Sequence, residues 1–206
     1  LGGAYWDTME SACSFVGVGI EGIVVPLRSG MTVPTNVNFL TADLSQTTGL
    51  KGDGSTTSIN TNYDPAGLTV NDISASVYVT TDRELGAGRY GESNTSASLI
   101  GNATGFRTFW QDPTLRTLGT STTLNGIIGC SRNNSANYDW YNVDESGTQT
   151  STSVAMTSGN SYVLYSRSAG GVHGSARLAT YHVGPALNLS TLGALQDTLI
   201  SEIAAI

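Results

Sequence analysis

The residues best suited to chemistry lie in the segment 132–142, which reads Arg-Asn-Asn-Ser-Ala-Asn-Tyr-Asp-Trp-Tyr-Asn. A sugar ring has an apolar face that stacks on aromatic side chains, and it has hydroxyl groups that hydrogen-bond to amides and carboxylates. This mixture of side chains therefore predicts a glycan-binding surface. The candidate binding residues are Tyr138, Asp139, Trp140, Tyr141 and Asn142.

Alternation limits how much of this segment can be a surface. On a β-strand, Tyr138 and Trp140 point to one face, whereas Asp139 and Tyr141 point to the other. One pair then faces a core, and an ordinary strand followed by a turn remains the alternative interpretation. A second candidate ligand residue is Trp110, which ends an aromatic run just before Gln-Asp-Pro.

The sequence lacks the residue patterns that are typical of hydrolases. Glycoside hydrolysis uses two carboxylates, and alternation along a strand can place them on one face. The nearest such pair, Asp82 and Glu84, falls in a predicted turn. His173 lies in a glycine-rich loop and His182 in a predicted strand, and no Gly-x-Ser-x-Gly motif is present. The sequence therefore predicts no catalytic residues and a protein that is not an enzyme.

The sequence also predicts no metal ligands and no cofactor. Cys13 and Cys130 are expected to be buried free thiols, because no other Cys or His lies at a metal-ligand spacing. Asp and Asn side chains in turns could hold Ca²⁺, but the Asp-x-Asp-x-Asp-Gly spacing of a dedicated calcium loop is missing. Calcium is therefore left open without a motif to support it.

Charge and composition exclude several partners. The net charge is −7, the only lysine is Lys51, and the arginines are scattered. Nucleic acids and anionic membranes both need clustered positive charge, so we expect neither as a partner. No apolar run reaches the roughly 20 residues of a membrane-spanning helix. With 25 glycines and only 12% charged residues, the composition is typical of a turn-rich β protein.

Short strand-like runs separated by polar turns dominate the middle of the chain. Runs at this spacing predict an all-β fold, a sandwich or jelly roll. The expected strands cover residues 37–40, 58–62, 73–80, 97–101, 106–111, 117–118, 126–130, 138–143, 150–156, 162–167 and 177–183.

Both ends of the chain predict helices. Residues 5–16 carry an apolar stripe of helical spacing, and residues 17–34 read as a linker. The expected organisation is an N-terminal helix and linker over residues 1–36, a jelly-roll β-sandwich over 37–187 and a C-terminal helix over 188–206.

The C-terminal helix has one continuous apolar stripe, and Ser190 is a candidate N-cap. The stripe packs either on the domain's own sandwich or on a neighbouring subunit, and both alternatives remain open. We favour a contact between copies of the chain. The stripe residues recur every three or four positions and are Leu192, Leu195, Leu199, Ile203 and Ile206.

Three segments together carry a family resemblance. A glycine-rich turn at 49–55 leads into a short strand, Asn-Asp-Ile-Ser-Ala-Ser-Val-Tyr-Val-Thr follows at 71–80, and Ala-Arg-Leu-Ala-Thr-Tyr-His-Val-Gly at 176–184 precedes the terminal helix. This arrangement resembles the concanavalin A-like, or laminin-G-like, jelly-roll modules of bacteriophage structural proteins. The resemblance runs from about Pro26 to Ile206.

The resemblance implies a function and a location. It implies a structural component of a phage virion, exposed on a tail fibre or decorating the capsid, that can bind host-surface glycans. Other virion proteins would be its partners, and by analogy with phage fibres it would form a homo-oligomer, a trimer. The alternatives are a polysaccharide-degrading enzyme, such as a depolymerase, and a secreted carbohydrate-binding module.

Overall fold

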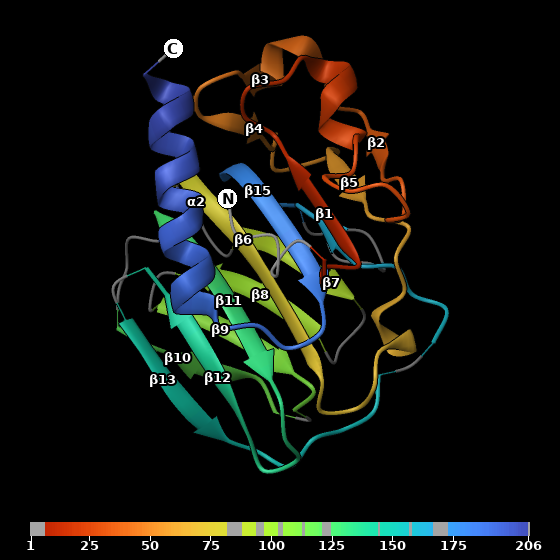
Figure 1. The fold of residues 1–206 in the computed structure, drawn as a ribbon, viewed down its shortest axis with the longest axis vertical. Coiled ribbons are helices and arrows are strands. Elements are labelled where there is room, and N and C mark those ends of the chain that lie inside the picture. The colour runs from red at the N-terminus through yellow and green to blue at the C-terminus, as the bar shows by residue number, and fades with distance from the viewer. Residues whose placement is uncertain are drawn as a thin grey trace.

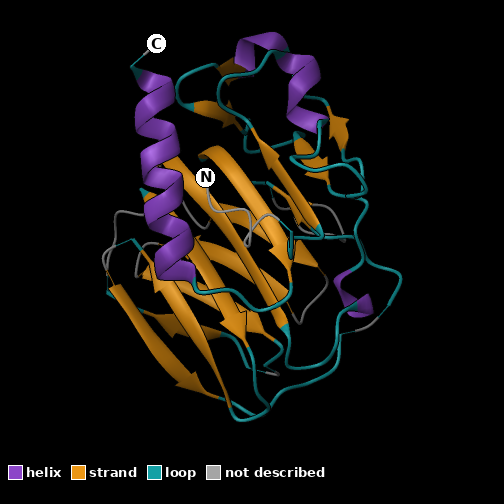
Figure 2. Cartoon of the chain, viewed as in Figure 1, coloured by secondary structure: helices purple, strands orange, loops and turns teal. Residues whose placement is uncertain are grey.

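The computed structural model describes residues 7–81, 88–93, 97–102, 105–112, 114–120, 125–143, 145–156, 158–166 and 173–205. Two antiparallel sheets lie face to face, and the helix α2 covers the outer face of one of them (Figures 1 and 2). We call this layer the helix-side sheet and the other the far sheet. The chain crosses repeatedly from one sheet to the other, which confirms the predicted β-sandwich.

The strands fall into two sets. The helix-side sheet has the order β13 (Glu145–Thr150), β12 (Asn137–Asn142), β11 (Gly126–Arg132), β6 (Ile73–Thr81), β15 (Arg177–Gly184), β4 (Gly49–Lys51) and β3 (Leu44–Ser45), and β1 (Ser11–Ser14) also pairs with β15. The far sheet has the order β10 (Arg116–Leu118), β9 (Gly105–Trp110), β8 (Ala97–Asn102), β7 (Gly88–Ser93), β14 (Val163–Leu164), β5 (Ser58–Asn60) and β2 (Thr35–Val37).

Helical structure is limited in the described part of the chain. Short 3-10 turns occur at Ile20–Val24, Thr41–Asp43 and Pro65–Gly67, and α2 spans Leu189–Ala204. The predicted cap of α2 is off by two residues. Asn188 is the N-cap, because its side-chain oxygen accepts a hydrogen bond from the Thr191 backbone N–H at 3.0 Å.

Strand β6 shows how the sequence builds the core. Its residues alternate, so every second side chain enters the space between the two sheets. Those core-facing side chains are fully buried and apolar: Ile73, Ala75, Val77 and Val79. The side chains on the opposite face are polar, yet Ser74 and Ser76 are buried as well, because a second layer of the protein covers them.

Helix α2 forms much of that second layer. Two glycines allow it to approach the sheet closely: a Cβ on Gly193 would lie 2.7 Å from Ile127 Cγ2, and a Cβ on Gly129 would lie 3.2 Å from Leu189 Cδ1. Polar contacts add to this packing, since Gln196 Nε2 donates to Thr180 Oγ1 at 2.8 Å. Helix and sheet therefore meet through both close backbone approach and specific hydrogen bonds.

The apolar stripe of α2 packs on the domain's own sheet. Leu192 is buried in a cluster with Met9, Ala12, Met31 and Ile127. Three further stripe residues are half-buried: Leu195, Leu199 and Ile203. Ile206 lies outside the described residues. Of the two packing alternatives, contact with the domain's own sandwich is therefore present, and the contact between copies stays a prediction.

The predicted N-terminal helix is wrong within the described residues. Residues 11–14 form β1, which pairs antiparallel with β15 so that Ser11 lies opposite Val183 and Ser14 opposite Thr180. The helical stripe misled because β1 is buried on both faces: Cys13 joins the core between the sheets and Ala12 the cluster under α2. The first part of the predicted helix, residues 5–6, lies outside the described residues.

Strand boundaries differ from prediction in a second place. Residues 150–156 do not form the expected strand, and the edge strand is β13 at Glu145–Thr150. Its residues Glu-Ser-Gly-Thr-Gln-Thr are polar throughout, so hydrophobic alternation could not reveal it. Strands β3, β4 and β7 were also not predicted, and two of them are only two or three residues long.

His182 on β15 is a buried neutral side chain. Ser74 Oγ donates to the Pro185 carbonyl oxygen at 2.6 Å, so the bond of 2.9 Å between Ser74 Oγ and His182 Nε2 is donated by the imidazole. Ser76 Oγ then donates to His182 Nδ1 at 2.7 Å. Burial lowers the pKa of His182 to about 3. The imidazole therefore bridges β6 and β15 in its uncharged form.

We predict a pH-dependent stability from this group. In the unfolded chain, His182 binds a proton near its ordinary pKa of about 6.5. In the folded protein, His182 stays unprotonated down to about pH 3. The free energy of unfolding should therefore fall as the pH is lowered through this window, by up to about 1.4 kcal/mol per pH unit. Denaturant unfolding of the wild type and of His182→Gln between about pH 7 and pH 4 measures it. Equal pH slopes for the two proteins would contradict the assignment.

Candidate functional site

Strand β12 divides the predicted ligand segment between two faces. Tyr138 and Asn142 are fully buried, and Trp140, on the same face, is half-buried against the core between the sheets. Asp139 is exposed and Tyr141 half-buried on the opposite face, beside α2. The alternation in the sequence was thus correctly read, and only the second face reaches solvent. We therefore remove Tyr138 and Asn142 from the candidate surface.

Tyr138 belongs to a structural cluster around Arg132. The Arg132 guanidinium lies 5.1 Å from the centre of the Tyr138 ring, and its Nη1 donates to the carbonyl oxygens of Asn137 at 3.2 Å and Ser151 at 3.0 Å. Burial is the main cause that raises the pKa of the Tyr138 hydroxyl well above its ordinary value. The turn ahead of β12 is thus held by a buried arginine.

The outer face of β12 continues onto β13. The register places Asp139 opposite Thr148 and Tyr141 opposite Ser146. Cross-strand neighbours are close enough to act together, so these four side chains form one polar surface. Sequence reasoning missed Ser146 and Thr148 because it placed the next strand after them.

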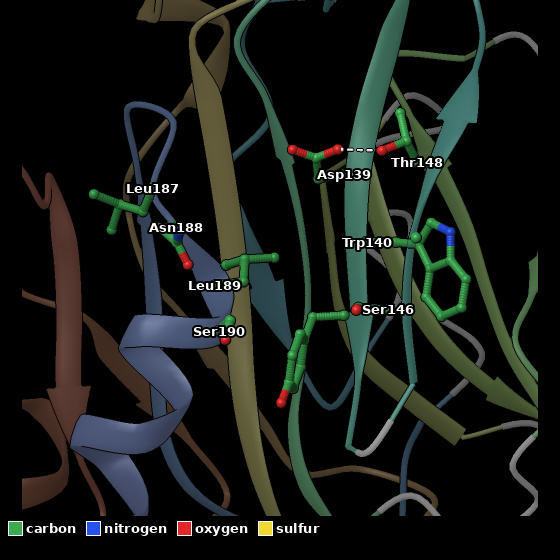
Figure 3. Close-up of a pocket in the computed structure, with 10 residues that line it drawn as sticks. Asp139, Trp140, Ser146, Thr148, Leu187, Asn188, Leu189 and Ser190 are labelled. Carbon is green, nitrogen blue, oxygen red and sulfur yellow. Dashed lines mark hydrogen bonds between the residues drawn. The ribbon is translucent and has the colours of Figure 1, made fainter.

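The N-terminal end of α2 faces this surface across a groove. The residues leading into the helix are held in place, since the Leu187 backbone N–H donates to Ser131 Oγ at 3.1 Å. The space between the strands and the helix end has a volume of about 250 Å³ (Figure 3). We call it the β12–α2 groove. It is lined by Asp139, Trp140, Tyr141, Ser146, Gly147, Thr148, Leu187, Asn188, Leu189 and Ser190.

The polar atoms of the groove are mostly available to a ligand. Thr148 Oγ1 donates to Asp139 Oδ1 at 2.7 Å, which fixes the carboxylate (Figure 3). Within the described part of the chain, Asp139 Oδ2 and the hydroxyls of Tyr141, Ser146 and Ser190 have no hydrogen-bond partner. Each hydroxyl can donate one bond and accept others, and the carboxylate can only accept. The groove therefore offers both donors and acceptors at fixed positions.

Trp140 supports the groove from below. Gly147 lies opposite Trp140 in the strand pair, and a Cβ on this glycine would lie 3.0 Å from the indole ring. The ring therefore packs against the bare backbone of β13, on the side of the sheet that faces the core. Trp140 therefore supports the edge strand with its ring, and it is also one of the residues that line the groove, so its role as a ligand residue stays a prediction.

The second candidate, Trp110, cannot be placed, because its side chain lies outside the described residues. The following Asp112 has a structural role. Burial raises the pKa of its carboxyl, but hydrogen bonds from Arg116, Thr114 and Ser151 outweigh this effect and lower the pKa below its ordinary value. The Asp112 to Arg116 ion pair measures 2.8 Å. The Asp112 carboxylate that follows Trp110 is therefore used within the fold.

The described residues contain no group of three or more His, Cys, Asp or Glu side chains placed to hold a metal ion. Cys13 and Cys130 are buried free thiols, as predicted. Burial raises the pKa of the Cys13 thiol to about 11, so it is unreactive near neutral pH. In the same described part, no helix is both long and apolar enough to cross a membrane.

Sequence comparison finds no protein-family model and no curated protein that matches this chain. Structure comparison does find proteins with a similar fold. The binding domain of botulinum neurotoxin serotype D matches 94% of this chain and 52% of its own length, with a TM-score of 0.60 and 10% identity. Domain 4 of AbnA, an extracellular GH43 arabinanase from Geobacillus stearothermophilus solved with arabinotriose, matches 91% of this chain and 98% of its own length, with a TM-score of 0.59 and 11% identity.

The fold is that of these binding domains. A further structure, the serotype D ligand-binding domain in complex with N-acetylneuraminic acid, has a TM-score of 0.56 and 11% identity, over 94% of this chain and 51% of its own. The present chain spans about half the length of the neurotoxin domains that it matches. At these identities the likeness establishes a shared β-sandwich and nothing about individual residues.

The face assignment of β12 makes a prediction about stability. Asp139→Ala and Ser146→Ala should change the free energy of unfolding by no more than about 0.5 kcal/mol, because both side chains are exposed. Tyr138→Ala on the same strand should cost about 3–5 kcal/mol, because it opens a cavity in the core. Denaturant unfolding of the three variants measures these changes. A loss for Asp139→Ala as large as that for Tyr138→Ala would reverse the face assignment.

Proposed function

We propose that this domain is a glycan-binding module without catalytic activity, exposed on the surface of a bacteriophage virion. The observation that carries glycan binding is the β12–α2 groove, where one carboxylate oxygen and three hydroxyls stand without partners in the described structure. Three of these four groups belong to the exposed side chains Asp139, Ser146 and Ser190, so water hydrates them and a ligand can reach them. Their concentration in one concave place favours a ligand rich in hydroxyl groups.

Recognition would divide between two kinds of contact. Asp139 Oδ2 accepts a hydrogen bond from a sugar hydroxyl, and the Ser146 and Ser190 hydroxyls donate to or accept from its neighbours. Tyr141 offers part of its ring as an apolar surface, while the rest packs beside Leu187 and Leu189. The polar groups set the orientation of the sugar and the ring excludes water from one of its faces.

The size of the groove indicates what length of glycan it takes. Its volume of about 250 Å³ is below the roughly 300–1,000 Å³ of sites that enclose a whole small molecule. It therefore holds a short part of a glycan, with modest affinity per site. Several copies on one particle would raise the overall affinity, because each further contact is then intramolecular.

The solved structures support glycan binding by analogy. An arabinanase domain of the same fold and nearly the same extent was solved with arabinotriose, and a neurotoxin ligand-binding domain with N-acetylneuraminic acid. These ligands belong to those proteins. For the present chain they make a sugar a chemically reasonable occupant of a groove that was identified independently.

The groove also favours binding over hydrolysis. Glycosidases place two carboxylates about 5–9.5 Å apart around the scissile bond. Among the described residues, Asp139 is the only acidic one that lines the groove. No observation in the described structure favours a polysaccharide depolymerase, so we do not propose one.

The virion location rests on the sequence resemblance to phage jelly-roll modules. We propose a structural component of a tail fibre or of the capsid decoration, with other virion proteins as partners. Locating the chain in an intact particle by cryo-electron microscopy tests this proposal. Its absence from purified particles that contain the other structural proteins would reject the virion location and leave glycan binding untouched.

A homo-oligomer, a trimer, is part of the same proposal, and α2 offers the contact. Leu195, Leu199 and Ile203 are only half-buried by the domain's own sheet. Ile203 also borders an open hollow of about 520 Å³ near Gly17 and Gln46. Apolar surface left partly exposed along one helix is typical of a subunit contact.

We predict that Leu195→Asp with Leu199→Asp will separate the subunits, and that the monomers will melt at a lower temperature but still fold, because both side chains are half-buried on the domain's own sheet and neither belongs to the core between the sheets. Light scattering measures the oligomer and a thermal melt measures folding. The matched control is Ala194→Asp with Thr198→Asp, which places the same charges on the exposed face of the helix. A wild-type chain that stays monomeric at high concentration would reject the contact between copies.

The groove makes a direct prediction about binding. On a glycan array, the wild type should bind a defined set of glycans, and Asp139→Ala combined with Thr148→Ala should weaken binding at least about tenfold, since charge-assisted hydrogen bonds contribute about 1.5–3 kcal/mol. Asp7→Ala is the control, because Asp7 is exposed and does not line the groove. Binding that the double substitution leaves unchanged would place the ligand elsewhere, and no binding to any glycan would reject the proposed function.

A further inference from the structure

The charge of the β12–α2 groove indicates which class of glycan it binds. Ten of the residues that the structure describes line the groove, and none of these is a lysine, arginine or histidine. The single charged side chain is Asp139, which is exposed and has one carboxylate oxygen directed at no partner in the described structure. A ligand in the groove therefore meets a negative charge without a compensating cation.

We propose that the groove selects neutral glycans and rejects acidic ones, such as those that end in N-acetylneuraminic acid or a uronic acid. This inference rests on the proposed glycan-binding function. A ligand carboxylate near Asp139 would be repelled, and neither group can donate a hydrogen bond to the other. Neutral sugar hydroxyls, in contrast, donate to the carboxylate, so the same side chain attracts one class of glycan and excludes the other.

The helix end that borders the groove attracts anions, so its partial charge must be compared with the negative charge of Asp139. The N-terminal end of α2 carries about half a positive charge from its aligned peptide groups. Asp139 carries a full negative charge, and the whole chain carries a formal net charge of −7. Moreover, the Asn188 side chain already binds the Thr191 N–H of the first helical turn. The carboxylate therefore dominates, and the long-range field of the protein acts in the same direction.

Sites that bind acidic sugars are built differently. Carboxylates are held by arginine or lysine, which form charge-assisted hydrogen bonds to both oxygens. Two described arginines are engaged in the fold: Arg132 with backbone carbonyl oxygens and Arg116 with Asp112. Neither lines the groove. The described lining of the groove thus has the acceptor for a neutral sugar and lacks the cation for an acidic one.

The experiment compares the binding of lactose with that of sialyllactose. The two ligands share the same neutral core, and sialyllactose carries one acidic sugar in addition. If the glycan array identifies another neutral ligand, that glycan replaces lactose, and the same glycan with one acidic sugar added replaces sialyllactose. Titration calorimetry should show at least about fivefold tighter binding of the neutral ligand, as expected for two like charges near 4 Å in water. Asp139→Asn keeps the shape of the side chain and should narrow this ratio, while Asp7→Asn should leave it unchanged.

Salt gives an independent readout. Raising the ionic strength from about 0.01 M to 1 M shortens the Debye length from about 30 Å to 3 Å. The ratio of neutral-ligand to acidic-ligand affinity should therefore decrease with salt in the wild type, and it should decrease much less in Asp139→Asn. Equal or tighter binding of the acidic ligand, or a ratio that Asp139→Asn does not change, would overturn the inference and leave the glycan-binding function standing. A protein that binds neither ligand, and no other glycan, would reject the function itself.

Discussion

The packing of α2 on the outer face of the helix-side sheet is the interaction on which the rest of the structure depends. Gly193 and Gly129 allow the helix backbone to lie close to β11, and Leu192 fills the space between them and the N-terminal segment. On a sheet face without such a covering layer, Ser74, Ser76 and His182 would form hydrogen bonds with water. With it, they are buried and must satisfy one another through hydrogen bonds, because an unpaired buried polar group costs several kcal/mol.

The same packing creates the candidate site. One wall of the β12–α2 groove is a pair of hydrogen-bonded strands, and the other is the fixed start of a helix. Groups on regular elements are held more rigidly than groups on loops, so Asp139 and Ser146 need little reordering to meet a ligand. Trp140 supports this arrangement from the core side, where its ring packs against Gly147. The groove is thus a consequence of how the core and the helix are packed.

Prediction failed where burial or polarity hid the secondary structure. Residues 11–14 are buried on both faces, so the apolar residues around them fitted a helical stripe as well as the buried strand that they form. Strand β13 is polar on both faces, because it lies at the edge of the sheet, and no periodicity marked it. Since β13 supplies Ser146 and Thr148, half of the strand wall of the groove was invisible to the sequence.

The sequence by itself determined which residues share a face. The separation of Tyr138 and Trp140 from Asp139 and Tyr141 follows from the geometry of a single strand, and so does the apolar stripe of the terminal helix. Which face of β12 became the surface was decided only in the tertiary structure. Strand pairing turned Tyr138 towards the core, and α2 arrived from the far end of the chain to complete the groove. Local alternation is a property of a few consecutive residues, whereas burial and site formation need partners that lie far apart in the sequence.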